Sequence, residues 1–153
     1  MPPTRHPRLA LLLVVLALVL AVPASAVTAT GRLQVIHLDV GQGDGAVIIS
    51  PLGEVAMVDN GVYTDPTPAG GVKVLGQLQA LGVTHVKHHF ASHYHSDHIG
   101  LMNTIFGSGG IGLDYGWDRG GSYSSSSYTN YVNVLGSRRR TLVKNQVITL
   151  DSL

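Results

Sequence analysis

Four side chains that can bind a divalent metal ion lie within six residues of one another. They are His93, His95, Asp97 and His98, three imidazoles and one carboxylate. Nitrogen and oxygen ligands suit a borderline cation such as zinc, and the chain has no cysteine, so a thiolate site is excluded. If a strand ends at Ser92 and a helix begins at His98, the turn directs the first two histidines to one ion and Asp97 with His98 to a neighbour. Two ions roughly 3.5 to 4 Å apart can share and activate one water.

The remaining histidines of the chain's central part are interpreted as structural. They are His37, His85, His88 and His89. His88 and His89 are adjacent in a predicted strand, so their side chains point to opposite faces and cannot both join one site.

The segments before the cluster have the pattern of an α/β protein. Apolar, β-branched runs bounded by glycine and proline turns predict strands at residues 32–40, 46–50, 55–59 and 84–92. The short connections between the first three favour an antiparallel start to a sheet. Residues 60–71 are predicted as a loop, and residues 72–81 have helical apolar spacing ended by Gly82.

The segments after the cluster have a weaker pattern. A helix is expected at 99–106, an irregular glycine- and serine-rich loop at 107–127, a serine-capped helix at 128–135 and a strand at 147–150. On this interpretation Asp114 and Asp118 lie in the loop and not at a strand end. The basic run 138–140 is taken as a solvated edge, with a phosphate-contacting patch as the alternative.

Residues 1–26 have the composition of a secretory signal peptide. Arg5 and Arg8 precede an uncharged run of 14 residues, 9–22, which is shorter than the roughly 20 residues needed to span a bilayer. Cleavage after Ala26 would leave a domain at 27–153, secreted or periplasmic and without stable membrane association; an uncleaved anchor is the alternative. Without the two arginines the charge is about −1, from which no affinity for nucleic acid follows.

The sequence HYHSDH resembles the His-x-His-x-Asp-His motif of the metallo-β-lactamase superfamily. Upstream, LQVIHLDVGQGDGAVII resembles the opening strand and glycine turn of the ComEC competence-protein branch, and MVDNG resembles the superfamily's short strand ending in an aspartate. This resemblance implies an αββα sandwich in which Asp59 orients the metal-binding loop. Asp44, in the glycine turn, is expected either at the rim of the site or in a plain turn role.

The resemblance extends over about residues 32–151, but the second half of the expected site is missing. Members of the superfamily complete it with a bridging aspartate and further histidines, and no histidine follows His98. We therefore expect approximately the N-terminal half of the sandwich, from a C-terminally truncated member, or else a half-domain with an incomplete site.

The activity implied by the resemblance is metal-dependent hydrolysis. Two zinc ions, or manganese, would hold a hydroxide that attacks a phosphodiester such as DNA, with Asp97 both a ligand and the group that orients the nucleophile. The same ligands would serve an acyl hydrolase acting on a lactam, lactone or thioester. A non-catalytic metal-binding domain is the third hypothesis, if the chain is complete.

Overall fold

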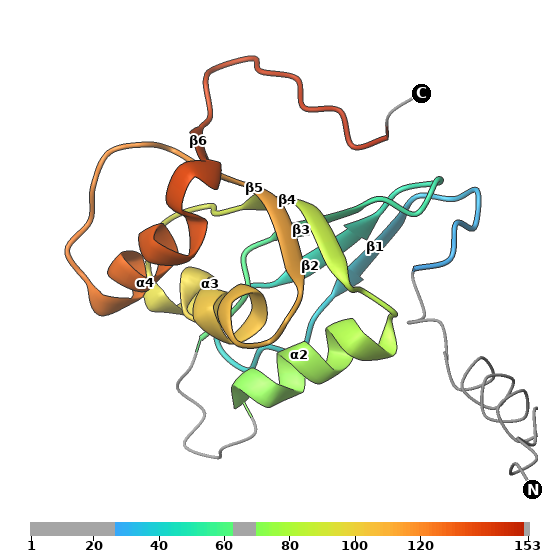
Figure 1. The fold of residues 1–153 in the computed structure, drawn as a ribbon, viewed down its shortest axis with the longest axis horizontal. Helices are drawn as coiled ribbons and strands as arrows, with labels where there is room; N and C mark the ends of the chain where they lie inside the picture. The colour runs from blue at the N-terminus through green and yellow to red at the C-terminus, as the bar shows by residue number, and fades with distance from the viewer. Residues whose placement is uncertain (1–26, 63–69, 152–153) are drawn as a thin grey trace, which may run out of the picture.

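The computed structural model of the protein describes residues 27–62 and 70–151. The predicted signal peptide lies outside them. The described chain forms one mixed six-stranded sheet with its helices gathered on one side (Figure 1). The strands are β1 (Gln34–His37), β2 (Ala46–Ile49), β3 (Val55–Val58), β4 (His85–Phe90), β5 (Gly112–Asp118) and β6 (Arg139–Thr141). The helices are α2 (Gly70–Ala80), α3 (Ser96–Ile99) and α4 (Ser126–Leu135), with a π-helical turn at Asn103–Gly107.

The strands lie in the sheet in sequence order. β1, β2 and β3 are antiparallel to one another, as predicted, whereas β3, β4, β5 and β6 are parallel. The carboxyl ends of the last four strands therefore meet at one edge of the sheet. The residues that follow β3 and β4 carry the candidate metal site.

A single apolar core lies between the sheet and the helices. It includes Met57 of β3, Leu78 of α2, Ile105 of the π-helical turn and Leu135 of α4, all at most 1% exposed. Burial of each such side chain contributes about 1.5–3 kcal/mol. The α/β class is thus confirmed. Among the described residues there is one sheet layer and one helical layer, so the αββα sandwich remains a prediction.

The prediction of an irregular loop at 107–127 is wrong, because this segment contains β5. Glycines weaken the strand pattern here, yet Gly116 is required by packing: a Cβ at this position would overlap the side chain of Leu135 on α4. Glycine has a low propensity for strands, but the close approach of α4 to the sheet requires it at this position. Asp118 ends this strand, contrary to the expectation that it lies in a loop.

Two further elements after the cluster differ from expectation. The expected strand at 147–150 is wrong, since these residues join no ladder and Val147 is 87% exposed; β6 forms instead within the basic run. The expected helix at 99–106 is a short α3 followed by the π-helical turn. The helix at the end of this region was predicted well: Ser125 caps α4, its hydroxyl accepting from the N–H of Tyr128 at 3.1 Å.

His88 and His89 point to opposite faces of β4, as predicted. His88 lies on the face away from the helices, where its Nδ1 accepts from the indole of Trp117 at 3.1 Å and its ring stacks with Tyr115. His89 is fully buried beneath the helices.

In the part of the chain described here, no helix has the length and apolarity needed to cross a membrane.

Candidate metal centre

The candidate metal centre lies where two parallel strands end side by side. Asp59 follows β3 directly, and the loop from Ser92 to His98 follows β4. The N–H of Asp59 donates to the carbonyl of Phe90 at 2.9 Å, which continues the pairing of the two strands by one step. Asp59 has a φ of 52°, a left-handed conformation that aspartate tolerates better than most residues.

The carboxylate of Asp59 is the anchor of this loop. It is 1% exposed and accepts the N–H of Ser92 at 2.8 Å on Oδ1 and the Ser92 hydroxyl at 2.6 Å on Oδ2. The same Oδ2 lies 2.7 Å from Nδ1 of His98. An ionised carboxylate only accepts, so Nδ1 of His98 carries a proton, and Nε2 is the nitrogen left to bind a metal ion when the ring is neutral.

His93 is oriented by the same anchor, through Ser92. Nδ1 of His93 lies 3.1 Å from the Ser92 hydroxyl oxygen. Because that hydroxyl already donates its proton to Asp59, it accepts from Nδ1 of His93. Nε2 is therefore the accepting nitrogen of a neutral His93 ring, and it lies in hydrogen-bond contact with Nδ1 of His95. One buried carboxylate thus sets the tautomers of two histidines.

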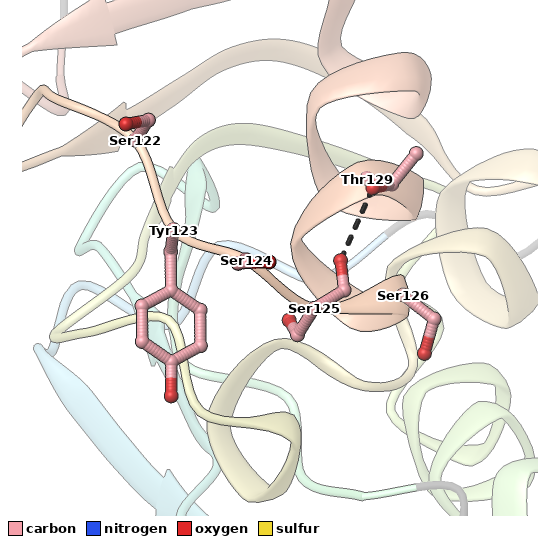
Figure 2. A pocket seen from close by; sticks show the side chains of 6 residues that line it. All are labelled: Ser122, Tyr123, Ser124, Ser125, Ser126 and Thr129. Atoms are coloured by element: carbon pink, nitrogen blue, oxygen red, sulfur yellow. Dashed lines mark hydrogen bonds between the residues drawn. The ribbon is translucent and has the colours of Figure 1, made fainter.

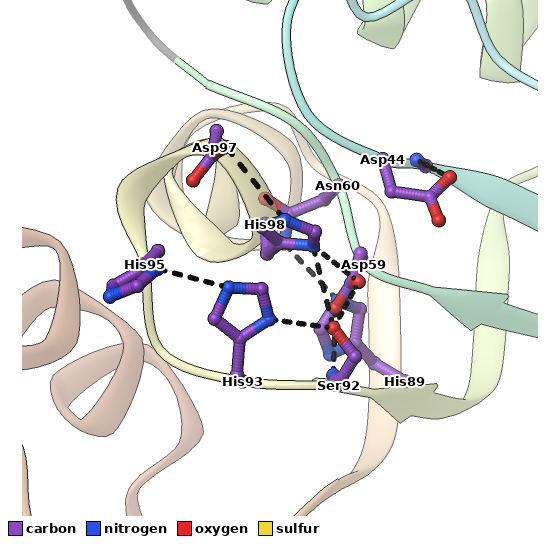
Figure 3. Close-up of polar contacts among 10 residues, drawn as sticks. Asp44, Asp59, Asn60, His89, Ser92, His93, His95, Asp97 and His98 are labelled. Carbon is purple, nitrogen blue, oxygen red and sulfur yellow. Dashed lines mark hydrogen bonds and ion pairs between the residues drawn. The ribbon is translucent and has the colours of Figure 1, made fainter.

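The four candidate ligands form two adjacent pairs (Figure 3). Nε2 of His93 lies 3.1 Å from Nδ1 of His95, and Nε2 of His98 lies 3.8 Å from a carboxylate oxygen of Asp97. Donor atoms of His93, Asp97 and His98 all lie within 4.8 Å of one another, and His95 is outside that group. His93 thus lies close to members of both pairs, and the predicted division of the ligands between two ions stays a prediction.

The spacing of these donor atoms fits a metal ion. Two nitrogens bound to one tetrahedral zinc at about 2.0–2.1 Å lie roughly 3.3 Å apart. The 3.1 Å between the His93 and His95 nitrogens is close to this value, and the donor set of imidazole and carboxylate suits zinc or manganese. The described residues thus include a group of side chains whose donor atoms could hold a metal ion.

Asn60 is a supporting residue that the sequence analysis missed. It is fully buried; its N–H donates to the carbonyl of His98 at 2.7 Å, and its Oδ1 accepts from the N–H of Leu101 at 2.9 Å. Its amide nitrogen lies 3.1 Å from Nε2 of His89. Asn60 therefore fixes the C-terminal end of α3 to the sheet, and its position directly after Asp59 was the available signal.

Burial lowers the pKa of His89 to about 4, only slightly offset by the charge of Asp59. The imidazole is therefore neutral at neutral pH. Since Asn60 donates to Nε2, the proton sits on Nδ1, a buried atom with no partner in the described part of the molecule. The ring is a structural support for Asn60, in agreement with its interpretation as structural.

The glycine turn between β1 and β2 packs directly on the metal loop. Gly43 has a φ of 93°, and a Cβ there would overlap the carbonyl of Asp97. The N–H of Asp44 donates to that carbonyl at 3.2 Å, while its exposed carboxylate accepts from Gly45 at 2.8 Å. The backbone of Asp44 thus contacts the site and its side chain stabilises the turn.

A second polar cluster, which we call the Asp118 clamp, lies at the end of β5. It consists of Asp118, Arg139, Tyr94 and Tyr131. Arg139 Nε donates to Oδ2 of the fully buried Asp118 at 2.6 Å, and the Tyr131 hydroxyl donates to the same oxygen at 3.0 Å. Burial alone would raise the pKa of Asp118, but the hydrogen bonds from Arg139 and Gly120 outweigh it and hold the pKa below its usual value. Arg139 is therefore not part of a solvated edge.

The other aspartate of the expected loop is also paired within the chain. Asp114 lies 2.9 Å from Nε2 of His85 on the protein surface, with about half of each side chain exposed. Neither Asp114 nor Asp118 belongs to the group of donor atoms at the metal centre.

Fold and site together define an α/β protein with a histidine- and aspartate-lined candidate metal centre at a sheet edge. No protein-family model and no curated protein matches the chain. Among solved structures, the chain is similar to a metallo-β-lactamase, SMB-1, in a complex with mercaptoacetic acid, with a TM-score of 0.49 and 17% identity over 85% of the chain. The chain spans 52% of the length of that protein.

Proposed function

We propose that the protein is an exported metal-dependent hydrolase that cleaves phosphodiesters. The observation that carries the proposal is the arrangement of His93, His95, Asp97 and His98, whose donor atoms lie within metal-binding distance of one another. The buried carboxylate of Asp59 holds His98 directly and His93 through Ser92, so that their Nε2 atoms face Asp97 and His95. The resemblance of HYHSDH to the superfamily motif supports the same conclusion.

The residues of the chain have separate roles in this proposal. His93 with His95 and Asp97 with His98 hold the two ions, and Asp97 also orients the attacking water. Asp59 and Ser92 hold the imidazoles in the tautomers that binding requires. A bound divalent ion would lower the pKa of water and stabilise the charge that develops on the attacked group.

The choice of a phosphodiester rests on resemblance and on charge. The opening strand and glycine turn resemble the ComEC branch, and Arg119, whose guanidinium lies over the ring of Tyr94, has no carboxylate within 4 Å among residues 27–62 and 70–151. An acyl hydrolase has no comparable observation in its favour.

Export is proposed from the composition of residues 1–26. The mass of the secreted protein tests it, and a start at Val27 is expected.

Metal binding and hydrolysis together test the proposed activity. We expect equilibrium dialysis to load zinc or manganese on the full chain, and His93→Ala to weaken binding by more than the ~10–100-fold typical of losing an outer partner. His37→Ala, an exposed histidine of β1, is the matched control and should bind like the wild type.

The hydrolysis assay compares bis(4-nitrophenyl) phosphate with nitrocefin, a lactone and a thioester. Release of nitrophenolate from the phosphodiester alone is the expected result. Preferred cleavage of nitrocefin, the lactone or the thioester would establish an acyl hydrolase instead. Metal-loaded protein that cleaves none of them would be a metal-binding domain and would refute the proposal.

A further inference from the structure

A pocket lined by hydroxyl groups lies where the chain enters α4 (Figure 2). Its volume is about 850 Å³, and it opens to solvent. The lining residues are consecutive hydroxyl-bearing side chains with one residue from the first turn of the helix: Ser122, Tyr123, Ser124, Ser125, Ser126 and Thr129. No lining residue carries a charge, so the pocket offers hydrogen-bond donors without an opposing carboxylate.

Tyr123 connects this pocket to the candidate metal centre. Its ring contacts the ring of His95 edge-on, with centroids 5.6 Å apart, and it is 40% exposed. A group bound against Tyr123 therefore lies next to a candidate ligand. The hydroxyl pocket is the adjoining space along the same segment.

Arg119 places a positive charge on the same side. Its guanidinium lies over the ring of Tyr94, 4.6 Å from the centroid, and Tyr94 in turn lies 6.3 Å from the Tyr123 ring. Arg119 is exposed, and within the described segments no carboxylate is close enough to neutralise it. Its charge is thus available to an anion in solution.

We propose that Tyr123, Arg119 and the serine-lined pocket form a subsite for single-stranded nucleotide chain beside the metal centre. This inference rests on the proposed function and names its substrate class. The exposed ring of Tyr123 stacks on a base, and the serine hydroxyls and Arg119 bind the neighbouring phosphates. A flat ring and neutral hydroxyls suit any base, so the subsite discriminates little between sequences.

Binding to metal-free full-length protein tests the subsite without turnover. Fluorescein-labelled pentathymidylate is compared with an abasic strand of the same length by fluorescence anisotropy. We expect Tyr123→Ala to weaken binding of pentathymidylate roughly 5- to 150-fold, as loss of one stacked base does, and to leave the abasic strand unaffected. Tyr123→Phe keeps the ring and should bind like the wild type.

The chain provides matched controls for both side chains. Tyr115 is 39% exposed and lies on the opposite face of β5, so Tyr115→Ala should leave binding unchanged. Arg119→Gln should weaken binding of both strands and reduce the salt dependence by a slope of about 0.7, the value for one phosphate contact on a single strand. Arg140→Gln, which removes a guanidinium 5.0 Å from the Tyr115 ring, should not.

Three results would overturn the subsite: no binding by the wild type, equal affinity of Tyr123→Ala and wild type for pentathymidylate, or equal losses in the Tyr123 and Tyr115 variants. Binding with the expected pattern, but no hydrolysis after metal loading, would retain the subsite and refute the proposed activity. The two failures are therefore distinguishable.

Discussion

Two polar clusters lie at the ends of neighbouring parallel strands. They differ in the groups that their carboxylates and imidazoles contact. In the Asp118 clamp every oxygen of the carboxylate accepts from a group of the chain, and Arg139 neutralises the charge. At the metal centre, Asp59 accepts in the same way, but the imidazoles that it holds turn their other nitrogens toward Asp97 and His95. A buried carboxylate neutralised by a cation of the chain is typical of structure, whereas several imidazole and carboxylate groups gathered within reach of one another are typical of a metal-binding site.

The two clusters are joined through Tyr94. This residue lies between His93 and His95 in the sequence, and its side chain, 2% exposed, points into the clamp. Its hydroxyl donates to the carbonyl of Gly120 at 2.8 Å and lies 3.1 Å from Arg139 Nη2. The alternation of side chains along the loop thus places two histidines at the metal centre and anchors the residue between them.

The largest effect that we expect is on stability, from Arg139→Met. This change leaves the buried carboxylate of Asp118 without its cation, and breaking such a pair costs about 3–5 kcal/mol. Urea unfolding of the metal-free protein measures the loss. Arg140→Met, at an exposed neighbour, should change the free energy of unfolding by less than about 0.5 kcal/mol.

The pH dependence gives a second measure of the clamp. The folded pKa of Asp118 is below its usual value, so its contribution is fully present above the unfolded pKa of about 3.9 and is lost as pH falls through the lower folded pKa. Arg139→Met should lose less stability than the wild type below pH 4. Equal stability of both proteins at pH 7 would show that the ion pair contributes nothing net.

A smaller effect, confined to the metal centre, is expected from Asp59→Asn. The amide has one accepting oxygen instead of two, so it cannot accept all three hydrogen bonds that Ser92 and His98 make to the carboxylate, and the tautomers of His93 and His98 are no longer fixed. We expect zinc affinity to fall by about 10- to 100-fold, measured by competition with a chromogenic chelator.

The control for this prediction is Asp114→Asn, which removes the other aspartate paired with a histidine, at 2.9 Å from His85. Zinc affinity should not change there. If the two variants bind zinc equally well, Asp59 has no role in orienting the ligands.

The sequence predicted the metal loop and the first half of the sheet because their signals are local. Ligand types at fixed spacing, and apolar runs between glycine turns, need no knowledge of distant residues. The clamp could not be predicted in this way, since Asp118 and Arg139 are 21 positions apart and β5 carries glycines where a strand pattern expects apolar side chains. Gly116 is explained only by Leu135 of α4, and Asn60 only by the arrival of α3.

The smallest effect that we expect is on the pH dependence of stability, and it comes from His89. Its folded pKa of about 4 lies below the unfolded value of about 6.5, so its contribution is fully present above pH 6.5 and is lost as pH falls toward 4. For the metal-free protein this amounts to about 1 kcal/mol between pH 6.5 and 5.5.

Removal of this titration should flatten the pH dependence of unfolding. His89→Gln should lose about 1 kcal/mol less stability than the wild type over that interval, whereas the exposed His37→Gln should follow the wild type. A parallel loss in His89→Gln and wild type would mean that His89 titrates normally. Its neutral ring would then not be what supports Asn60.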